Sequence, residues 1–237
     1  MTRPLLLGHR GARASRDIPE NTLASFELCL QQGCDGFEFD VRRSADGDAV
    51  VCHDPVVRGM EIERTLATDL GLPSLEDVLR NFAARAFLDI ELKVAGLEAQ
   101  TVAALRVYPP QNGYVVSSFL PEVLSAIHDL DSGVPPGFIV DQRSEVGRWQ
   151  QLPVEWMISH FEVTDQELIA KSHAAGKKVM VWTVNQGDEM RKFAEWGVNG
   201  IISDETDAGA PVVRDLTPLE TDSSIQHGIG TSGKRRL

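Results

Sequence analysis

The sequence predicts a single-domain (β/α)8 barrel. Eight short apolar segments alternate with segments of helical periodicity over roughly 210 residues, the length of such a barrel. This alternation implies parallel strands joined by right-handed crossovers. A doubly wound open sheet is the alternative, but polar residues follow many strands at their carboxyl ends, which a barrel gathers at one mouth. These strand-end residues are His9, Asp40, Lys93, Ser118, Asp141, His160, Asn185 and Asp204.

The first unit begins with residues 5–9, an apolar run that predicts a buried strand. Residues 19–22, Pro-Glu-Asn-Thr, are a good helix start, and the apolar residues after them are spaced for one buried face. Gly33 is expected to end this helix, because glycine adopts the left-handed conformation at a helix terminus.

The second predicted strand alternates strictly. Its apolar side chains share one face: Phe37, Phe39 and Val41. Glu38 and Asp40 share the other face, with their Cα atoms roughly 6–7 Å apart. Two carboxylates this close repel each other unless a cation lies between them or one holds a proton. On a buried strand they predict a hard divalent cation, whereas on an edge strand they would simply be solvated.

The same pattern recurs in the third strand, at residues 86–93. Asp89, Glu91 and Lys93 alternate there with apolar residues, so the polar side chains share one face. Two strands with acidic residues facing one interior predict a site built between strands.

The other elements follow from the same periodicities. A hairpin turn at residues 46–48 leads to a short strand ending at His53, residues 56–73 are expected to be irregular, and Ser74 caps a helix with Asp77 at its third position. Further strands are predicted at 114–118, 137–140, 155–160, 178–184 and 200–204. Further helices are predicted at about 96–107, 121–130, 144–151, 165–175, 187–196 and 207–215.

The composition excludes some classes of partner. The 237 residues are 42% hydrophobic and 24% charged, which is typical of a soluble globular protein. Lys and Arg number 23 against 35 Asp and Glu, a net charge of −12. This balance argues against nucleic acid or an anionic membrane as the main partner, because both select basic surfaces. A small anionic substrate fits if a metal ion and a few cationic side chains reverse the local field.

Location and boundaries are also predicted. The three cysteines Cys29, Cys34 and Cys52 have no repeated spacing, so they are expected to be reduced thiols in a cytoplasmic protein. No signal peptide is recognised, and no apolar run approaches the ~18 residues that span a membrane. The barrel domain is placed at residues 1–216, and residues 217–237 are expected to form a disordered tail. The oligomeric state is left open.

Several short strings, in order over about residues 5–210, resemble the glycerophosphodiester phosphodiesterase family. They are GHRG at Gly8–Gly11, PENT at Pro19–Thr22, E-x-D at Glu38–Asp40, HDP at His53–Pro55, the E-x-K within Asp89–Lys93, WTVN at Trp182–Asn185 and GIISD at Gly200–Asp204. The resemblance implies a TIM barrel and a bound divalent cation, Mg²⁺ or Ca²⁺. It also implies a phosphoric diester hydrolase that converts glycerophosphodiesters to sn-glycerol 3-phosphate and an alcohol.

The resemblance also implies site residues. Glu38, Asp40 and Glu91 match the family's metal ligands, and three carboxylates suit Mg²⁺ or Ca²⁺. His9 and His53 match its catalytic histidines, and histidine can act as base or acid near neutral pH. We expect His9 to be the base and His53 the acid, although the reverse assignment is open.

Three further residues are expected to bind substrate. Arg10 and Lys93 can hold the phosphate oxygens, and Trp182 matches the family's pocket tryptophan, which would pack on glycerol. Three further residues are candidates either for the pocket or for supporting other site residues: Ser118, Asn185 and Asp204. His160 is a candidate for the mouth. The segment at 54–73 is shorter than the usual active-site insert of the family, which implies a more open mouth.

Two other functions compete with this one. A lysophospholipase D or phosphatidylinositol phospholipase C-like activity would need an apolar rim, for which Val56, Val57 and Met60 are the candidates. A catalytically silent barrel that binds phosphodiesters is the other. It is disfavoured because both histidines, the three acidic residues and Lys93 are all present.

Overall fold

The structure, a computed structural model, describes residues 3–216 and contains a closed barrel of eight parallel strands. The strands are β1 (Leu5–His9), β2 (Gly36–Arg43), β6 (Phe87–Leu92), β7 (Tyr114–Ser118), β8 (Pro136–Val140), β9 (Trp156–His160), β10 (Lys178–Trp182) and β11 (Gly200–Ser203). Strand β1 pairs with both β11 and β2, which closes the sheet. The predicted barrel is therefore confirmed and the open sheet is excluded.

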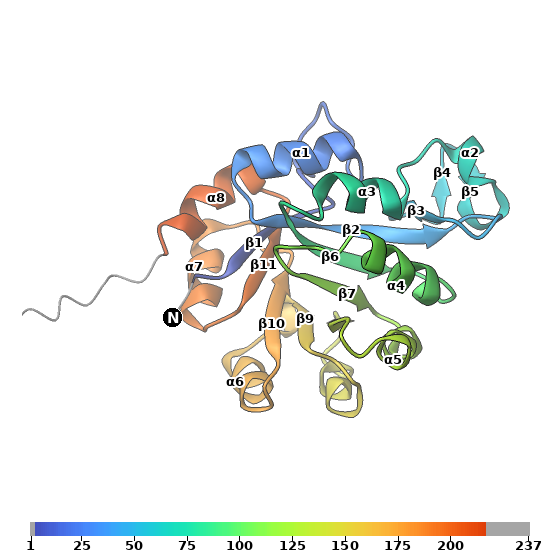
Figure 1. Cartoon of the computed structure of the whole chain (residues 1–237). Coiled ribbons are helices and arrows are strands. Elements are labelled where there is room, and N and C mark those ends of the chain that lie inside the picture. Colours follow the sequence, from blue (N-terminus) through green and yellow to red (C-terminus); the bar gives the residue numbers. More distant parts are fainter. Residues whose placement is uncertain (1–2, 217–237) are drawn as a thin grey trace, which may run out of the picture.

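Helices surround the strands (Figure 1). They are α1 (Leu23–Gln32), α3 (Leu75–Phe82), α4 (Glu98–Val107), α5 (Pro121–Leu130), α6 (Gln166–Ala174), α7 (Gly187–Glu195) and α8 (Thr206–Arg214). The segment between β8 and β9, predicted as a short helix, is the 3-10 helix η2 (Val146–Gln151).

The predicted helix ends coincide with observed caps. The Thr22 side chain accepts a hydrogen bond from the Ser25 backbone N–H and so begins α1, and Gly33 ends that helix with a φ of 99°. Ser74 and Asp77 form the expected capping box of α3.

Strand β2 lies between β1 and β6, and its two faces have different surroundings. Phe37 stacks on Phe26 of α1 with ring centroids 4.2 Å apart, and it meets Phe82 of α3 edge-on at 5.1 Å. Because side chains alternate along a strand, this packing directs Glu38 and Asp40 into the barrel. The edge-strand interpretation of these acidic residues is therefore wrong.

The barrel interior is apolar over most of its length. One buried cluster draws on seven of its strands: Leu7, Phe87, Val115, Ile139, Trp156, Ile158, Met180 and Ile202. This cluster provides the apolar base on which the polar mouth is built.

Residues 56–73 are more regular than predicted. They contain the two-residue strands β4 (Val56–Val57) and β5 (Met60–Glu61), the 3-10 helix η1 (Ile62–Arg64) and the short helix α2 (Ala67–Leu70). Ile62 and Leu70 are buried beside the short strand β3 (Ala49–Val51) in a small separate core. Figure 1 shows this subdomain-like group beyond the end of β3, to one side of the barrel.

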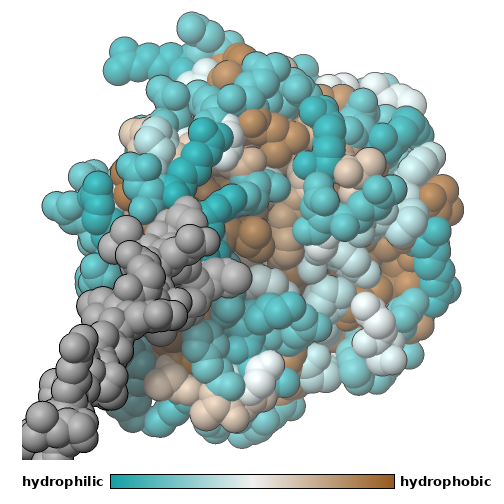
Figure 2. Space-filling model, turned by 60° about the vertical axis from the view of Figure 1, so that its left-hand side comes forward, coloured by the Kyte–Doolittle hydropathy of each residue, from teal (hydrophilic) through white to brown (hydrophobic). Residues whose placement is uncertain are grey.

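On the face shown in Figure 2, hydrophilic residues surround small, separate hydrophobic areas. Within residues 3–216, no helix is long and apolar enough to cross a membrane.

The three cysteines are buried and form no disulfide bond with one another, as predicted. The expected tail at 217–237 lies outside the described residues, so that boundary remains a prediction.

Candidate active site

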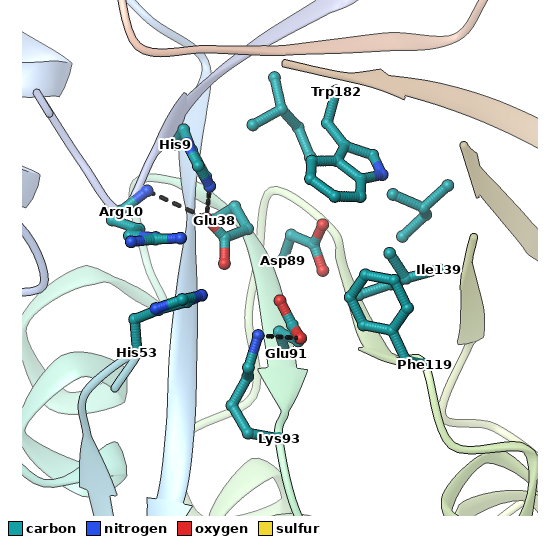
Figure 3. A pocket seen from close by; sticks show the side chains of 12 residues that line it. His9, Arg10, Glu38, His53, Asp89, Glu91, Lys93, Phe119, Ile139 and Trp182 are labelled. Atoms are coloured by element: carbon teal, nitrogen blue, oxygen red, sulfur yellow. Dashed lines mark hydrogen bonds and ion pairs between the residues drawn. The ribbon is translucent and has the colours of Figure 1, made fainter. Parts of the chain in front are cut away.

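A cavity of about 120 Å³ lies at the carboxyl ends of the barrel strands. Its polar wall contains seven residues: His9, Arg10, Glu38, His53, Asp89, Glu91 and Lys93. Its apolar wall consists of Phe119, Ile139, Ile158, Trp182 and Ile202 (Figure 3). Seven of the eight predicted site residues therefore line one cavity, and the eighth, Asp40, is buried beside it among the acidic residues.

The acidic residues are aligned by the pairing of β2 with β6. Glu38 lies opposite Asp89, and Asp40 lies opposite Glu91, so four carboxyl groups face the interior from two strands. One oxygen from each of Glu38, Asp40 and Glu91 lies within 4.8 Å of the others. All three residues are buried, and the most exposed of them, Glu91, is 7% exposed. A set of buried oxygen donors this close suits a hard divalent cation.

These carboxyl groups differ in their ionisation. Burial, reinforced by Asp40 and Glu91, raises the pKa of Glu38 well above its ordinary value. Burial also raises the pKa of Glu91 to about 7. Burial acts against ionisation of Asp40 too, but Lys93, the Asn21 amide and Arg10 keep the pKa of that carboxyl below its usual value.

Two cationic side chains offset only part of this negative charge. Lys93 Nζ lies 2.6 Å from Glu91 Oε1 and 3.4 Å from Asp40 Oδ1, and Arg10 Nε lies 3.3 Å from Asp40 Oδ2. Glu38 Oε1 is buried without a hydrogen-bond partner within the described part of the chain. A buried ion network is thus present but incomplete, and a divalent cation would supply the missing positive charge.

His9, at the end of β1, contacts the carboxylate of Asp204, which follows the neighbouring strand β11. Its Nδ1 lies 2.7 Å from Asp204 Oδ1, and its Nε2 lies 3.9 Å from Glu38 Oε2. Burial lowers the pKa of His9, although the hydrogen bond to Asp204 opposes this. A neutral ring that donates its Nδ1–H to Asp204 leaves Nε2 as a proton acceptor facing the cavity.

Asp204 is fixed in turn by its neighbours. The Asn185 amide donates to Asp204 Oδ2 at 3.0 Å, and Arg13 Nη1 donates to Oδ1 at 3.0 Å. Despite partial burial, the hydrogen bonds from His9, Asn185 and Arg13 hold the pKa of Asp204 well below its usual range. Asp204 and Asn185 are the residues that the sequence predicts for the pocket or for supporting other site residues, but the sequence does not indicate which residue they contact. Their role in orienting His9 depends on the closure of β1 against β11.

His53 lies in the loop after β3 and lines the same cavity as His9. Its backbone carbonyl accepts a hydrogen bond from Arg42 Nε at 2.7 Å, and its Nδ1 lies 2.7 Å from Asp54 Oδ1. Its side chain is 33% exposed, whereas that of His9 is 11% exposed. The rings of both histidines point towards the centre of the cavity in Figure 3.

Asn21 is a site residue that the sequence interpretation missed. Its Nδ2 donates to Asp40 Oδ2 at 2.8 Å, and its Oδ1 accepts from the Asp40 backbone N–H at 3.3 Å. Its φ of 56° is a left-handed conformation, which asparagine tolerates better than most residues. The sequence placed Asn21 only at a helix start, and an Asn before a helix carries no signal for a contact with β2.

The other candidates take different roles. Trp182 meets Phe119 edge-on at 5.9 Å and the His160 ring at 5.1 Å, so it forms an aromatic side of the cavity. The Ser118 hydroxyl donates to the Leu92 carbonyl at 2.7 Å and is fully buried, so it joins two strands and does not line the cavity. Among the described residues that line the cavity, none comes from 54–73.

The comparisons with known proteins agree with this geometry. The profile of the Glycerophosphoryl diester phosphodiesterase family matches residues 9–100 and 107–208. A glycerophosphodiester phosphodiesterase of Caldanaerobacter subterraneus is 28% identical over 241 residues, covering 89% of this chain and 98% of that protein.

Solved structures are similar in fold. An Oleispira antarctica phosphodiesterase in complex with the product sn-glycerol-3-phosphate superposes with a TM-score of 0.78 at 26% identity, covering 90% of this chain and 97% of that one. A glycerophosphodiester phosphodiesterase from Agrobacterium tumefaciens gives a TM-score of 0.74 at 26% identity, covering 90% and 99%.

Proposed function

The chain belongs to the glycerophosphoryl diester phosphodiesterase family, a family of phosphoric diester hydrolases, and on that premise we propose a specific reaction for its site. The protein hydrolyses a glycerophosphodiester to sn-glycerol 3-phosphate and an alcohol. A divalent cation, Mg²⁺ or Ca²⁺, binds Glu38, Asp40 and Glu91, and His9 and His53 transfer the protons. The observation that carries the proposal is the meeting of these acidic residues and both histidines around one cavity.

His9 serves as the general base. Its Nδ1–H is engaged by Asp204, its Nε2 faces the cavity, and its lowered pKa keeps the ring neutral and ready to accept a proton. The proton comes from the attacking hydroxyl, which belongs either to water or to the glycerol of the substrate itself.

His53 serves as the general acid for the leaving alkoxide. It is the more exposed of the two histidines and lies at the mouth, where an alcohol can depart into solvent. Its Nδ1 contact with Asp54 favours the ring orientation in which Nε2 points into the cavity. The cation, when bound, would stabilise negative charge on the phosphoryl oxygens.

Arg10, Lys93 and Trp182 bind the substrate. The guanidinium and ammonium groups already lie beside the acidic cluster, within reach of a phosphate held there. The Trp182 ring, together with Phe119, offers an apolar surface for the carbon atoms of glycerol.

The geometry gives the lipid-directed alternative little support. Val56, the most exposed of its proposed rim residues, lies in β4 beyond β3, and the described cavity wall includes none of Val56, Val57 and Met60. The acidic net charge fits a small, water-soluble diester better than a lipid surface. Three free cysteines fit a protein of the cytoplasm.

The test is a panel of glycerophosphodiesters with enzymatic detection of sn-glycerol 3-phosphate, run with Mg²⁺, with Ca²⁺ and with EDTA. Release that depends on the divalent ion is expected. His9→Ala and His53→Ala should each reduce turnover by roughly 10²–10⁴-fold, whereas His173→Ala, an exposed histidine on α6, should retain it. No release from any diester would favour the silent barrel, and an active His9→Ala variant would remove His9 from the mechanism.

A further inference from the structure

One buried carboxyl group in the cavity is not used by the reaction described above. Asp89 is 0% exposed, and its Oδ1 accepts a hydrogen bond from the Ser117 hydroxyl at 2.5 Å. Its Oδ2 has no hydrogen-bond partner among residues 3–216. An unpaired buried carboxyl oxygen is costly, and this one belongs to a residue of the cavity wall.

Asp89 lies opposite Glu38 and next to the cation site, but it is not one of the residues that form that site. The three acidic residues whose oxygens converge within 4.8 Å do not include it. Figure 3 shows its carboxyl group between Glu38 and the apolar wall, on the side towards Trp182 and Ile139. The cationic groups of Arg10 and Lys93 lie beside Asp40 and Glu91, two residues further along the strands.

The cavity therefore offers three kinds of contact in a fixed order. Cationic groups and the acidic cluster suit a phosphate, Trp182 and the isoleucines suit a short carbon chain, and Asp89 Oδ2 suits one hydroxyl group beside that chain. A hydroxyl both donates and accepts hydrogen bonds, so it pairs with this oxygen whether or not the carboxyl group holds a proton.

We infer that Asp89 is a specificity-determining residue that binds a hydroxyl of the glycerol half of the substrate, with Ser117 fixing its orientation. The inference rests on the proposed function and adds the feature that separates glycerol from other three-carbon groups. A site built to hydrogen-bond a hydroxyl discriminates strongly against an analogue without it, because its own buried oxygen is then left unpaired.

The experiment compares two ligands that differ only in hydroxyl groups, sn-glycerol 3-phosphate and propyl phosphate. Their dissociation constants are measured by calorimetry at saturating Ca²⁺ for the unmodified protein, Asp89→Leu and Ser117→Ala. The unmodified protein should prefer sn-glycerol 3-phosphate by roughly 10–100-fold. Asp89→Leu should lose most of this preference while it still binds propyl phosphate, and it should still bind Ca²⁺ because the three converging carboxyl groups are unchanged.

Two results would overturn the inference. One is a preference that survives in Asp89→Leu, and the other is a large loss of Ca²⁺ affinity in that variant, which would place Asp89 among the metal ligands. If Asp89→Leu fails to fold, Ser117→Ala decides the matter. It removes the hydroxyl that fixes Asp89 and leaves the carboxyl group in place, so the preference should fall several-fold; an unchanged preference would overturn the inference. These binding constants are measured without turnover. If the protein hydrolysed no diester, the proposed function would be refuted, but the measured preference would still test the role of Asp89.

Discussion

At the scale of single residues, the basicity of His9 depends on a carboxylate 195 positions away in the chain. Asp204 accepts the Nδ1–H and so selects the ring tautomer with an unprotonated Nε2. An amide at position 204 could donate to Nδ1 instead and place the proton on Nε2.

Asp204→Asn should therefore lower kcat by roughly 10²–10⁴-fold, with a KM for substrate that changes little. Steady-state kinetics across pH 5.5–9 test this, because the lost tautomer should not be restored at any pH in the range. Asp188→Asn, at a fully exposed position of α7, is the control. Unchanged kcat in Asp204→Asn would show that His9 acts without this partner.

A second residue-scale dependence links Asn21 to Asp40. Asn21→Gly removes both hydrogen bonds to Asp40 but keeps a residue that accepts a positive φ. The affinity for Ca²⁺ should fall about 10–100-fold, the usual effect of losing a group that orients a metal ligand. Calorimetric titration measures this, with Asn112→Gly on an exposed loop as control. Equal affinities in the two variants would mean that Asp40 needs no such support.

The residues of the site were predictable where they belong to short local patterns. Glu38, Asp40 and Glu91 were identified from alternation along two strands, and the family resemblance added His9 and His53. The contacts that orient them were not predictable, because Asn21 with Asp40 and Asp204 with His9 meet only when the barrel is assembled.

At the scale of elements, β2 connects stability with function through its two faces. Phe37 and Phe39 pack outwards against the helices, which turns Glu38 and Asp40 inwards. The placement of the acidic cluster thus depends on the aromatic packing behind it.

Phe37→Ala should lower the free energy of unfolding by about 3–5 kcal/mol, because a fully buried ring that contacts Phe26 and Phe82 is lost. Chemical denaturation measures the change, and Val107→Ala, at a residue 67% exposed, should cost less than about 0.5 kcal/mol. A loss below about 1 kcal/mol for Phe37→Ala would mean that α1 and α3 do not depend on this ring.

The elements of the barrel were predictable because each is long enough to display its period, as β6 does with strict alternation and α3 with its capping box. The strands β4 and β5 were missed because two residues cannot display a period. Their pairing depends on a turn with positive φ at Arg58 and Gly59 and on the burial of Ile62.

At the scale of the whole molecule, the acidic interior links stability to pH and to the cation. The folded pKa values of Glu91 and Asp89 are raised by burial to about 7, above their ordinary values of 4.5 and 3.8. Because the folded protein binds these protons more tightly than the unfolded chain, they stabilise the fold fully at a pH below the ordinary pKa values. This stabilisation is lost as the pH rises through about 7. The metal-free protein should accordingly lose stability between about pH 4.5 and pH 7.

A divalent cation should reverse this loss, because it binds the ionised carboxylates of the folded state. Ca²⁺ at a hundredfold excess over its Kd should raise Tm by about 5–10 °C at pH 8, and by much less at pH 5.5. Differential scanning calorimetry with Ca²⁺ and with EDTA measures both values. An equal rise in Tm at the two pH values would indicate that the ion binds elsewhere.

Diffraction from crystals grown with Ca²⁺ and sn-glycerol 3-phosphate would test most directly whether two strands and two loops assemble one metal-assisted hydrolase site. We expect a single ion bonded to oxygens of Glu38, Asp40 and Glu91 at about 2.3–2.6 Å, with the phosphate between His9 and His53. An ion bound away from these carboxylates, or a phosphate out of reach of either histidine, would contradict the account.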